Sequence, residues 1–264
     1  MAEPHLLLDR DGHVLIVTMN RPQARNAWSL EMMARMWDAW QEIDRDPDIR
    51  VAILTGAAGT FSAGADLKLM HSDQSSNPWH ARFREDPELH WKAMLRHYSL
   101  KKPFIAAVEG FALGGGTEIL QTTDIRVAAR SATFGLTEPC YGLFPLGGST
   151  VRLRRQIPHT MAMDMLLTGR RISAEEACRF GLIGRVVDDG QALSVALEVA
   201  QQIAANGPLA VQAIKRSVLA GAHLSEADAL AMELEIGQPV FKTRDAREGP
   251  RAFAERRKPA FKGE

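Results

Sequence analysis

Cysteine is scarce in this sequence and neither sign of charge is in excess, and both facts restrict its function. The two cysteines, Cys140 and Cys178, are too few for a disulfide framework and lack the close spacing of zinc ligands. Lys+Arg and Asp+Glu are both 32, so the formal net charge is zero, which argues against nucleic acid or an anionic membrane as the main partner. We therefore expect no metal site, and two reduced thiols that pack as small apolar side chains.

Long apolar runs and nucleotide-binding motifs are also missing. No apolar stretch reaches the roughly 20 residues that span a bilayer, and the first residues, MAEPHLLLDRDGH, lack a basic segment followed by an apolar one. The chain has no GxxxxGK[ST] or GxGxxG segment for a nucleotide and no GxSxG turn for a nucleophilic serine. These absences favour a cytoplasmic protein without membrane insertion, and they do not support a nucleotide cofactor or a serine hydrolase.

What the sequence does contain is an alternation of buried strands and helices. With 264 residues, of which 45% are hydrophobic, the chain can form a sizeable core. Ser29 is typical of a helix N-cap, because apolar residues spaced three and four apart follow it. The alternation predicts an α/β layered fold with largely parallel pairing. The strands are predicted at residues 13–19, 50–55, 105–108, 125–129 and 132–134.

The last third of the sequence is almost entirely helical. SAEE at residues 173–176 fits a helix capping box, and further helices are predicted at residues 191–205 and after Ser225. We therefore divide the chain into a core, residues 1–200, and a C-terminal helical segment, residues 201–264.

The stretch that most suggests chemistry is a glycine-rich turn, residues 110–116, between a buried strand and a helix that carries Glu118 in its first turn. Free backbone N–H groups and the dipole at a helix start can stabilise a developing oxyanion. Glu118 lies three residues after Gly115, so its carboxylate can share that space. Taken alone, this stretch is explained equally well by a turn that needs glycine for packing, with Glu118 as an ordinary first-turn acid.

A second loop of small residues, GAAGTFSAGADLKLM, occupies residues 56–70. Its residues 63–65 leave room for a ligand to approach the backbone, and Asp66 can anchor the turn or cap the helix that follows. We expect this loop to face Gly115. The polar and aromatic segment after it, residues 71–102, has the length of a lid or specificity loop and a weak helical pattern near its end, at residues 88–98.

Six segments distributed over nearly the whole chain carry a further signal. They are ARNAWS at 24–29, FSAGADLKLM at 61–70, AAVEGFALGGGTEIL at 106–120, ATFGLTEPCYGLFPLGGSTVRL at 132–153, TGRRISAEEACRFGLIGRVV at 168–187 and FAERRKPAF at 253–261. In this order they resemble the enoyl-CoA hydratase/isomerase (crotonase) family. The resemblance implies a crotonase-like spiral of ββα units with a C-terminal helical trimerisation segment, in a homotrimer or dimer of trimers. It also implies an acyl-CoA thioester substrate and no separate cofactor, because coenzyme A is part of that substrate.

The resemblance gives both small-residue loops and two glutamates a role. The backbone N–H groups of Ala63 and Gly115 match the family's oxyanion hole, which holds the thioester carbonyl. Glu118 and Glu138 match the pair that adds water to an α,β-unsaturated thioester, and we assign Glu118 mainly to the water and Glu138 mainly to the proton at Cα. The predicted activity is reversible hydration of a trans-2-enoyl-CoA to a 3-hydroxyacyl-CoA, in fatty-acid or steroid side-chain β-oxidation.

Contacts with coenzyme A are implied for other residues. Ala65, Asp66 and Leu67 match the segment whose backbone lines the adenine pocket in relatives, and Arg25 matches a residue near the CoA phosphates. The basic run at residues 256–258 either adds phosphate contacts or forms a solvated tail.

Some positions depart from the commonest hydratase pattern: Thr137 precedes Glu138, Pro139 follows it, and Leu146 stands in the FPLGG loop. Three alternatives therefore remain open. They are isomerisation, which needs a proton shuttle but no activated water; another crotonase reaction, such as thioester hydrolysis, dehalogenation or carbon–carbon bond cleavage; and a non-catalytic acyl-CoA-binding protein. Retention of both glutamates favours hydration. The combination TEILQTTDIRVA with YGLFPLGGSTVRL is most similar to actinobacterial-type hydratases, some of which act on bulky steroid or long-chain acyl thioesters.

Overall fold

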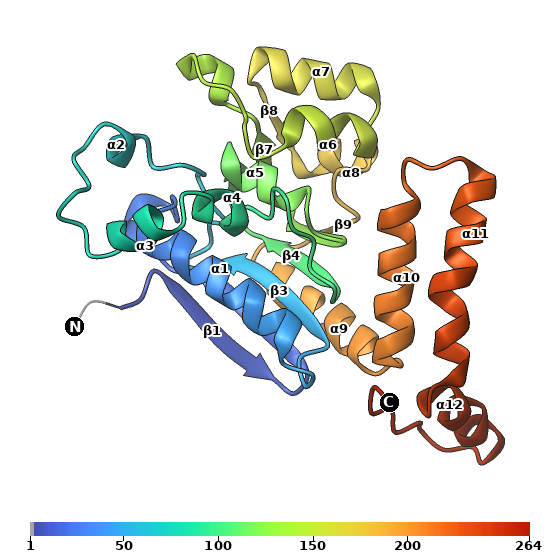
Figure 1. The fold of residues 1–264 in the computed structure, drawn as a ribbon. Coiled ribbons are helices and arrows are strands. Elements are labelled where there is room, and N and C mark those ends of the chain that lie inside the picture. Colours follow the sequence, from blue (N-terminus) through green and yellow to red (C-terminus); the bar gives the residue numbers. More distant parts are fainter. Residues whose placement is uncertain (1–2) are drawn as a thin grey trace.

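The structure, a computed structural model, describes residues 3–264 and contains two β-sheets (Figure 1). The strands pair in parallel except for β1 with β2 and β7 with β8, which confirms the predicted α/β fold with largely parallel pairing. The six-stranded sheet has the order β1 (Leu6–Asp11), β2 (Val14–Met19), β3 (Val51–Gly56), β4 (Phe104–Val108), β6 (Ile125–Ala129) and β9 (Arg185–Val187). The three-stranded sheet has the order β5 (Phe111–Leu113), β7 (Thr133–Gly135) and β8 (Arg171–Ser173).

The predicted strands are confirmed to within about one residue at each end, but β1, β5, β8 and β9 were not predicted. β1 is an edge strand whose residues after Leu6 are exposed, so it lacks the apolar pattern of the central strands. β5 lies inside the segment that we interpreted as a glycine-rich turn, and it is only three residues long. It places the start of the next helix, α5 (Gly115–Leu120), at the end of a parallel strand.

The large sheet is buried on both faces. On one face, Ile53 and Val127 pack against Ala196 and Ala200 of α9 (Ala192–Ala204). On the other face the core includes Trp40 from α1 (Leu30–Arg45), whose indole N–H donates to the Ala93 carbonyl at 2.8 Å. Burial on two faces explains why the central strands are apolar at nearly every position.

The helix ends follow the predicted capping signals. Ser29 caps α1 by accepting a hydrogen bond from the N–H of Met32, and Ser173 with Glu176 forms the predicted capping box of α8 (Ala174–Phe180). The predicted boundary at residue 200 falls inside α9. The C-terminal helices that follow lie beside the body in Figure 1; they are α10 (Pro208–Gly221), α11 (Glu226–Gly237), the 3-10 helix η3 (Gln238–Lys242) and α12 (Asp245–Ala254).

The segment between β3 and β4 forms three short helices, α2 (Leu67–Met70), α3 (His80–Glu85) and α4 (Leu89–Ala93). The helix predicted at residues 88–98 is therefore shorter than expected, and Leu95 just beyond it has the positive φ of 52°.

Two further expectations concern the exposure of Cys140 and the absence of a membrane-spanning segment. Cys140 is exposed rather than packed in the core, which corrects that expectation. Among residues 3–264, no helix is both long enough and apolar enough to span a membrane.

Two short 3-10 helices and two α-helices complete the described part of the chain. A short 3-10 helix, η1 (Pro22–Ala24), follows β2, and a second, η2 (Glu138–Tyr141), follows β7. After η2 the chain forms a loop and then α6 (Ser149–Gln156) and α7 (His159–Thr168). The loop between η2 and α6 approaches α5, and this approach builds the site described next.

Candidate active site

A pocket of about 510 Å³ lies between the first turn of α1, the loop after β3, the α3–α4 region, α5 and the loop before α6. Glu118, Glu138 and His90 are among its few polar residues, and Ala65 and Gly115 lie on its wall. An apolar pocket with a few polar groups is typical of a small-molecule site. Its apolar side chains include Trp28, Leu30, Met33, Leu69, Met70, Phe83, Trp91, Met94, Leu143, Phe144 and Leu146. The segment that we interpreted as a lid or specificity loop thus supplies part of the wall.

Glu118 is held by backbone N–H groups. Its side chain is buried, and its two carboxylate oxygens accept hydrogen bonds from Gly147 at 3.0 Å and from Ser149 at 3.2 Å. Burial raises the pKa of Glu118, while the hydrogen bonds from Ser149 and Gly147 and the charge of Arg152 oppose that rise. Because each donor favours the ionised carboxylate, Glu118 is suited to act as a base.

Glu138 stands in a different environment. It begins η2, and its Oε2 atom is buried with no hydrogen-bond partner among the described residues. Burial raises the pKa of Glu138 to about 7, and the negative charge of Glu118 adds to the rise. Glu138 can therefore hold a proton at neutral pH and act as an acid, whereas the N–H donors and Arg152 limit the rise in the pKa of Glu118 and favour its carboxylate form. Two carboxyl groups whose environments separate their pKa values are typical of an acid and a base in one site.

Gly115 and Ala65 bring backbone donors to the pocket. Gly115 is the first residue of α5, and no acceptor within residues 3–264 takes its N–H. A Cβ on Gly64 would lie 2.7 Å from the Gly115 nitrogen, so the loop after β3 directly contacts the start of α5. Ala65 follows Gly64, and its N–H likewise has no acceptor in the described part of the chain. The expectation that the two small-residue loops face each other is confirmed.

The prediction for Ala63 is wrong. Its N–H donates to the carbonyl of Arg25 at 3.0 Å and so is not available to a ligand, and Ala63 does not line the pocket. The next N–H groups along the loop explain the difference. The N–H of Gly64 bonds to the hydroxyl of Ser62 at 3.0 Å, which leaves Ala65 as the free donor beside Gly115. Sequence spacing could not distinguish two alanines that flank one glycine.

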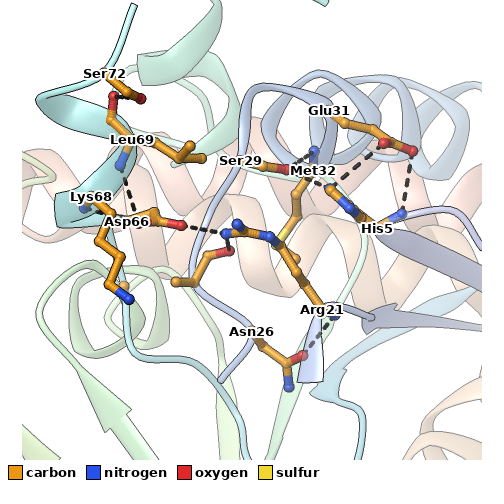
Figure 2. A network of polar contacts seen from close by, with 12 residues as sticks. His5, Arg21, Asn26, Ser29, Glu31, Met32, Asp66, Lys68, Leu69 and Ser72 are labelled. Carbon is orange, nitrogen blue, oxygen red and sulfur yellow. Dashed lines mark hydrogen bonds and ion pairs between the residues drawn. The ribbon is translucent and has the colours of Figure 1, made fainter. Parts of the chain in front are cut away.

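Asp66 anchors this loop. One carboxylate oxygen caps α2 by accepting from Lys68 and Leu69, and the other pairs with Arg21 at 2.6 Å, as Figure 2 shows. Burial opposes ionisation of Asp66, but the hydrogen bond and charge of Arg21 outweigh it and lower the pKa. Arg21 also donates to the carbonyl of Ala27 at 3.2 Å, next to Trp28. The Asp66 carboxylate therefore fixes the loop that carries Ala65, which is the anchoring role predicted from the sequence.

The other residues predicted to contact coenzyme A lie outside the pocket. Arg25 is exposed, has a φ of 54°, and stacks 5.9 Å from the ring centre of Phe111. Leu67 is on the exposed side of α2. In the basic tail, Arg257 is paired with Glu248 and Glu255. These contacts leave a role in binding coenzyme A as a prediction for Arg25 and Leu67.

Sequence reasoning missed the residues that hold Glu118. The N–H groups of Gly147 and Ser149 come from a loop about 30 residues further along the chain, and backbone donors leave no mark in side-chain chemistry. Trp28 was also missed, although it lines the pocket. A Cβ on Gly115 would lie 2.9 Å from its ring, so the aromatic ring explains why glycine stands at that position.

Comparison with known proteins agrees with this geometry. An enoyl-CoA hydratase from Mycobacterium tuberculosis, EchA19, is 56% identical over 98% of this chain and 96% of its own. The (E)-benzylidenesuccinyl-CoA hydratase of Thauera aromatica is 39% identical, with 97% of this chain and 98% of that protein covered. A crystal structure of an enoyl-CoA hydratase from M. tuberculosis superimposes with a TM-score of 0.89 at 39% identity, covering 99% of this chain and all of that one.

The fold of those relatives is the crotonase spiral, so the predicted fold class is confirmed. The sequence model of the enoyl-CoA hydratase/isomerase family matches residues 9–264. That match includes the glycine-rich loop, both glutamates and the C-terminal helices. The chain therefore belongs to the enoyl-CoA hydratase/isomerase family.

Proposed function

We propose that the protein is an enoyl-CoA hydratase that adds water reversibly to a trans-2-enoyl-CoA. The observation that carries this proposal is the pair of carboxyl groups in one pocket. Two N–H groups hold Glu118, and the buried Oε2 of Glu138 has no hydrogen-bond partner within residues 3–264. Hydration needs a base for water and an acid for Cα, and the two environments favour these two protonation states. The 56% identical relative, EchA19, is named an enoyl-CoA hydratase, which supports the same activity here.

In the proposed reaction, the thioester carbonyl accepts hydrogen bonds from the N–H groups of Ala65 and Gly115. Glu118 takes a proton from water while the water oxygen attacks Cβ, and the electron pair of the double bond moves toward Cα and the carbonyl oxygen. The two N–H groups stabilise this enolate charge, and loss of one such donor typically costs about 3–4 kcal/mol in the barrier. Glu138 then gives its proton to Cα, which completes the 3-hydroxyacyl-CoA.

Enoyl-thioester absorbance provides the test. We expect wild-type protein to consume trans-2-enoyl-CoA, and Glu118→Gln and Glu138→Gln each to lose on the order of 10²–10⁴-fold in rate. Glu175→Gln is the matched control, because Glu175 is an exposed acid on α8 whose one ion pair within residues 3–264 is with Arg130. Rates measured with a panel of short, medium, long and steroid side-chain thioesters show which acyl group the enzyme prefers. Conversion of 3-enoyl to 2-enoyl thioesters without hydration would instead show an isomerase, and binding without any turnover would show an acyl-CoA-binding protein.

The proposal extends to the oligomeric state, the location and the cofactor requirement of the enzyme. We expect a cytoplasmic homotrimer or dimer of trimers that needs no separate cofactor, since coenzyme A arrives with the substrate. The large exposed apolar side chains of the C-terminal helices support assembly, among them Ile214, Val218, Leu230 and Leu234. Light scattering during gel filtration distinguishes monomer, trimer and hexamer. The acyl preference found with the thioester panel will show whether the enzyme acts in fatty-acid or in steroid side-chain breakdown.

A further inference from the structure

An arginine stands behind the loop that holds Glu118. Arg152, on α6, is partly buried, and its guanidinium donates to three backbone carbonyls of two different segments. The Nη1 atom bonds to Gly147 at 3.0 Å, and the Nη2 atom bonds to Leu95 at 2.7 Å and Arg96 at 3.0 Å. The two segments are the loop before α6 and the chain just after α4, and Gly147 and Met94 of these segments line the pocket side by side.

Gly147 connects this arginine to Glu118. Its N–H donates to the Glu118 carboxylate, and its carbonyl accepts from Arg152. Both polar groups of one residue are therefore used, one toward the base and one toward the guanidinium. Arg96 reinforces the arrangement, because its Nε donates to the carbonyl of Leu146 at 2.7 Å. The loop amide that orients Glu118 is thus held from behind by two arginines.

Arg152 is a partly buried cation whose hydrogen-bond partners carry no charge. All three are neutral carbonyls, and within residues 3–264 no carboxylate forms an ion pair with it. A desolvated guanidinium without a paired acid is costly. The acid whose charge acts on it is Glu118, which lies one residue away through the Gly147 peptide.

We propose that Arg152 is a positioning residue for hydration, which fixes the Gly147 amide against Glu118, favours the ionised carboxylate by its positive charge, and ties the loop before α6 to residues 95–96, next to Met94 on the pocket wall. The inference rests on the proposed function. It differs from a general stabilising role because it requires both the hydrogen-bond geometry and the positive charge of Arg152.

The charged and titratable groups around Glu118 are few. Glu138 faces it across the pocket, Arg152 and Arg96 lie behind it, and His90 lies on the pocket wall. Loss of the Arg152 charge leaves Glu118 beside Glu138 without its compensating cation. Protonation of the base is then easier, so the acidic limb of the rate profile moves to higher pH.

The test compares Arg152→Gln, Arg152→Lys and Arg155→Gln, the last an exposed arginine on the same helix. We expect Arg152→Gln to lose on the order of tenfold or more in kcat/KM at neutral pH and to move the acidic limb upward. Arg152→Lys should restore the limb but not the full rate, because lysine keeps the charge without the planar fork that reaches three carbonyls. Arg155→Gln should match wild type. An unshifted acidic limb in Arg152→Gln overturns the proposal, even if the rate falls.

A second readout does not depend on turnover. Carbon NMR of protein labelled at glutamate carboxyl groups follows the ionisation of Glu118, identified by its absence in Glu118→Gln. Arg152→Gln should raise the pKa of this carboxyl and Arg152→Lys should not. If wild-type protein hydrates no thioester but the titration shifts as expected, only the proposed function fails. If wild-type protein is active and the titration does not shift, the role of Arg152 fails by itself.

Discussion

The carboxylate of Glu118 accepts a hydrogen bond from the N–H of Gly147 at 3.0 Å, whereas the buried Oε2 of Glu138 has no partner among residues 3–264. Two acids that are chemically identical in the sequence are thus placed in unequal environments. The donors on Glu118 stabilise negative charge, and the apolar surroundings of Glu138 stabilise the protonated form. Four predictions follow from this geometry and from the contacts around it.

Hydration should slow above neutral pH. Glu138 must be protonated to deliver a proton to Cα, and burial raises its pKa to about 7. We expect kcat for hydration to fall by about tenfold per pH unit well above this value. A rate profile at saturating substrate checks this, with binding of a saturated acyl-CoA at the same pH values as the control. A kcat that stays constant to pH 9 would contradict the role of Glu138 as the acid.

Glu138→Gln should stabilise the protein at high pH and not at low pH. The carboxyl ionises at about 4.5 when unfolded and at about 7 when folded, so the folded state retains the proton between these values. Stability is therefore lost as pH rises through this window, by at most about 3 kcal/mol and by less where solvent screens the group. Glutamine stays neutral and avoids the loss.

Thermal denaturation of wild type and Glu138→Gln at pH 5 and pH 8 checks this second prediction. The variant should gain on wild type mainly at pH 8. Glu175→Gln, which removes an exposed acid, should show no such pH-dependent gain. An equal difference at both pH values would mean that Glu138 does not carry the raised pKa.

Gly147→Ala should abolish most activity. The added Cβ would lie 2.7 Å from Oε2 of Glu118 and would also collide with the Cε of Met94. Met94 is flexible and can move, but Glu118 cannot move without losing its N–H donor. We expect a rate loss of about 10²-fold or more.

Two further variants separate the causes. Adding Met94→Ala to Gly147→Ala should relieve the collision with Met94 and leave the activity low. Gly237→Ala should be active, because a Cβ there meets nothing within 4 Å. Recovery of activity in the double variant would show that Met94, and not Glu118, is the sensitive contact.

Arg21 and Asp66 should be strongly coupled. Their side chains are only 16% and 10% exposed, so removal of one leaves the other charge buried without its partner. We expect Arg21→Gln and Asp66→Asn each to cost about 3 kcal/mol, and the double variant to cost clearly less than the sum. Chemical denaturation of the four proteins gives the coupling energy. The exposed pair of Arg130 with Glu175 serves as the reference and should couple by less than about 1 kcal/mol.

Much of the fold could be predicted because it depends on local signals. Apolar runs predicted the central strands, Ser29 and Ser173 predicted two helix starts, and both were found as capped ends. β1 was not predicted, because its residues neither alternate nor form a fully apolar run, and pairing with β2 stabilises a strand that is exposed after Leu6. The helix expected at residues 88–98 ends at Ala93, and the left-handed φ of 52° at Leu95 prevents it from continuing.

Like the fold, the candidate site could be predicted only in part. Glu118, Glu138 and Gly115 were predicted from motifs whose residue types the chemistry requires, and the structure places all three on one pocket. The choice of Ala65 over Ala63 depends on which N–H is already bonded, here that of Ala63 to the Arg25 carbonyl. Hydrogen bonds between distant backbone groups have no signature in a single sequence, so no spacing rule could have made that choice.

By itself, then, the sequence determined the family, the parallel α/β core and the identity of the two acids, because each depends on residue type and order along the chain. Only the tertiary structure decided how those acids differ. Gly147 and Arg152 are far from Glu118 in the sequence, and the pKa of Glu138 depends on what is packed around it. Electrostatic environment is a property of three-dimensional neighbours, and it assigns the base and the acid in this pocket.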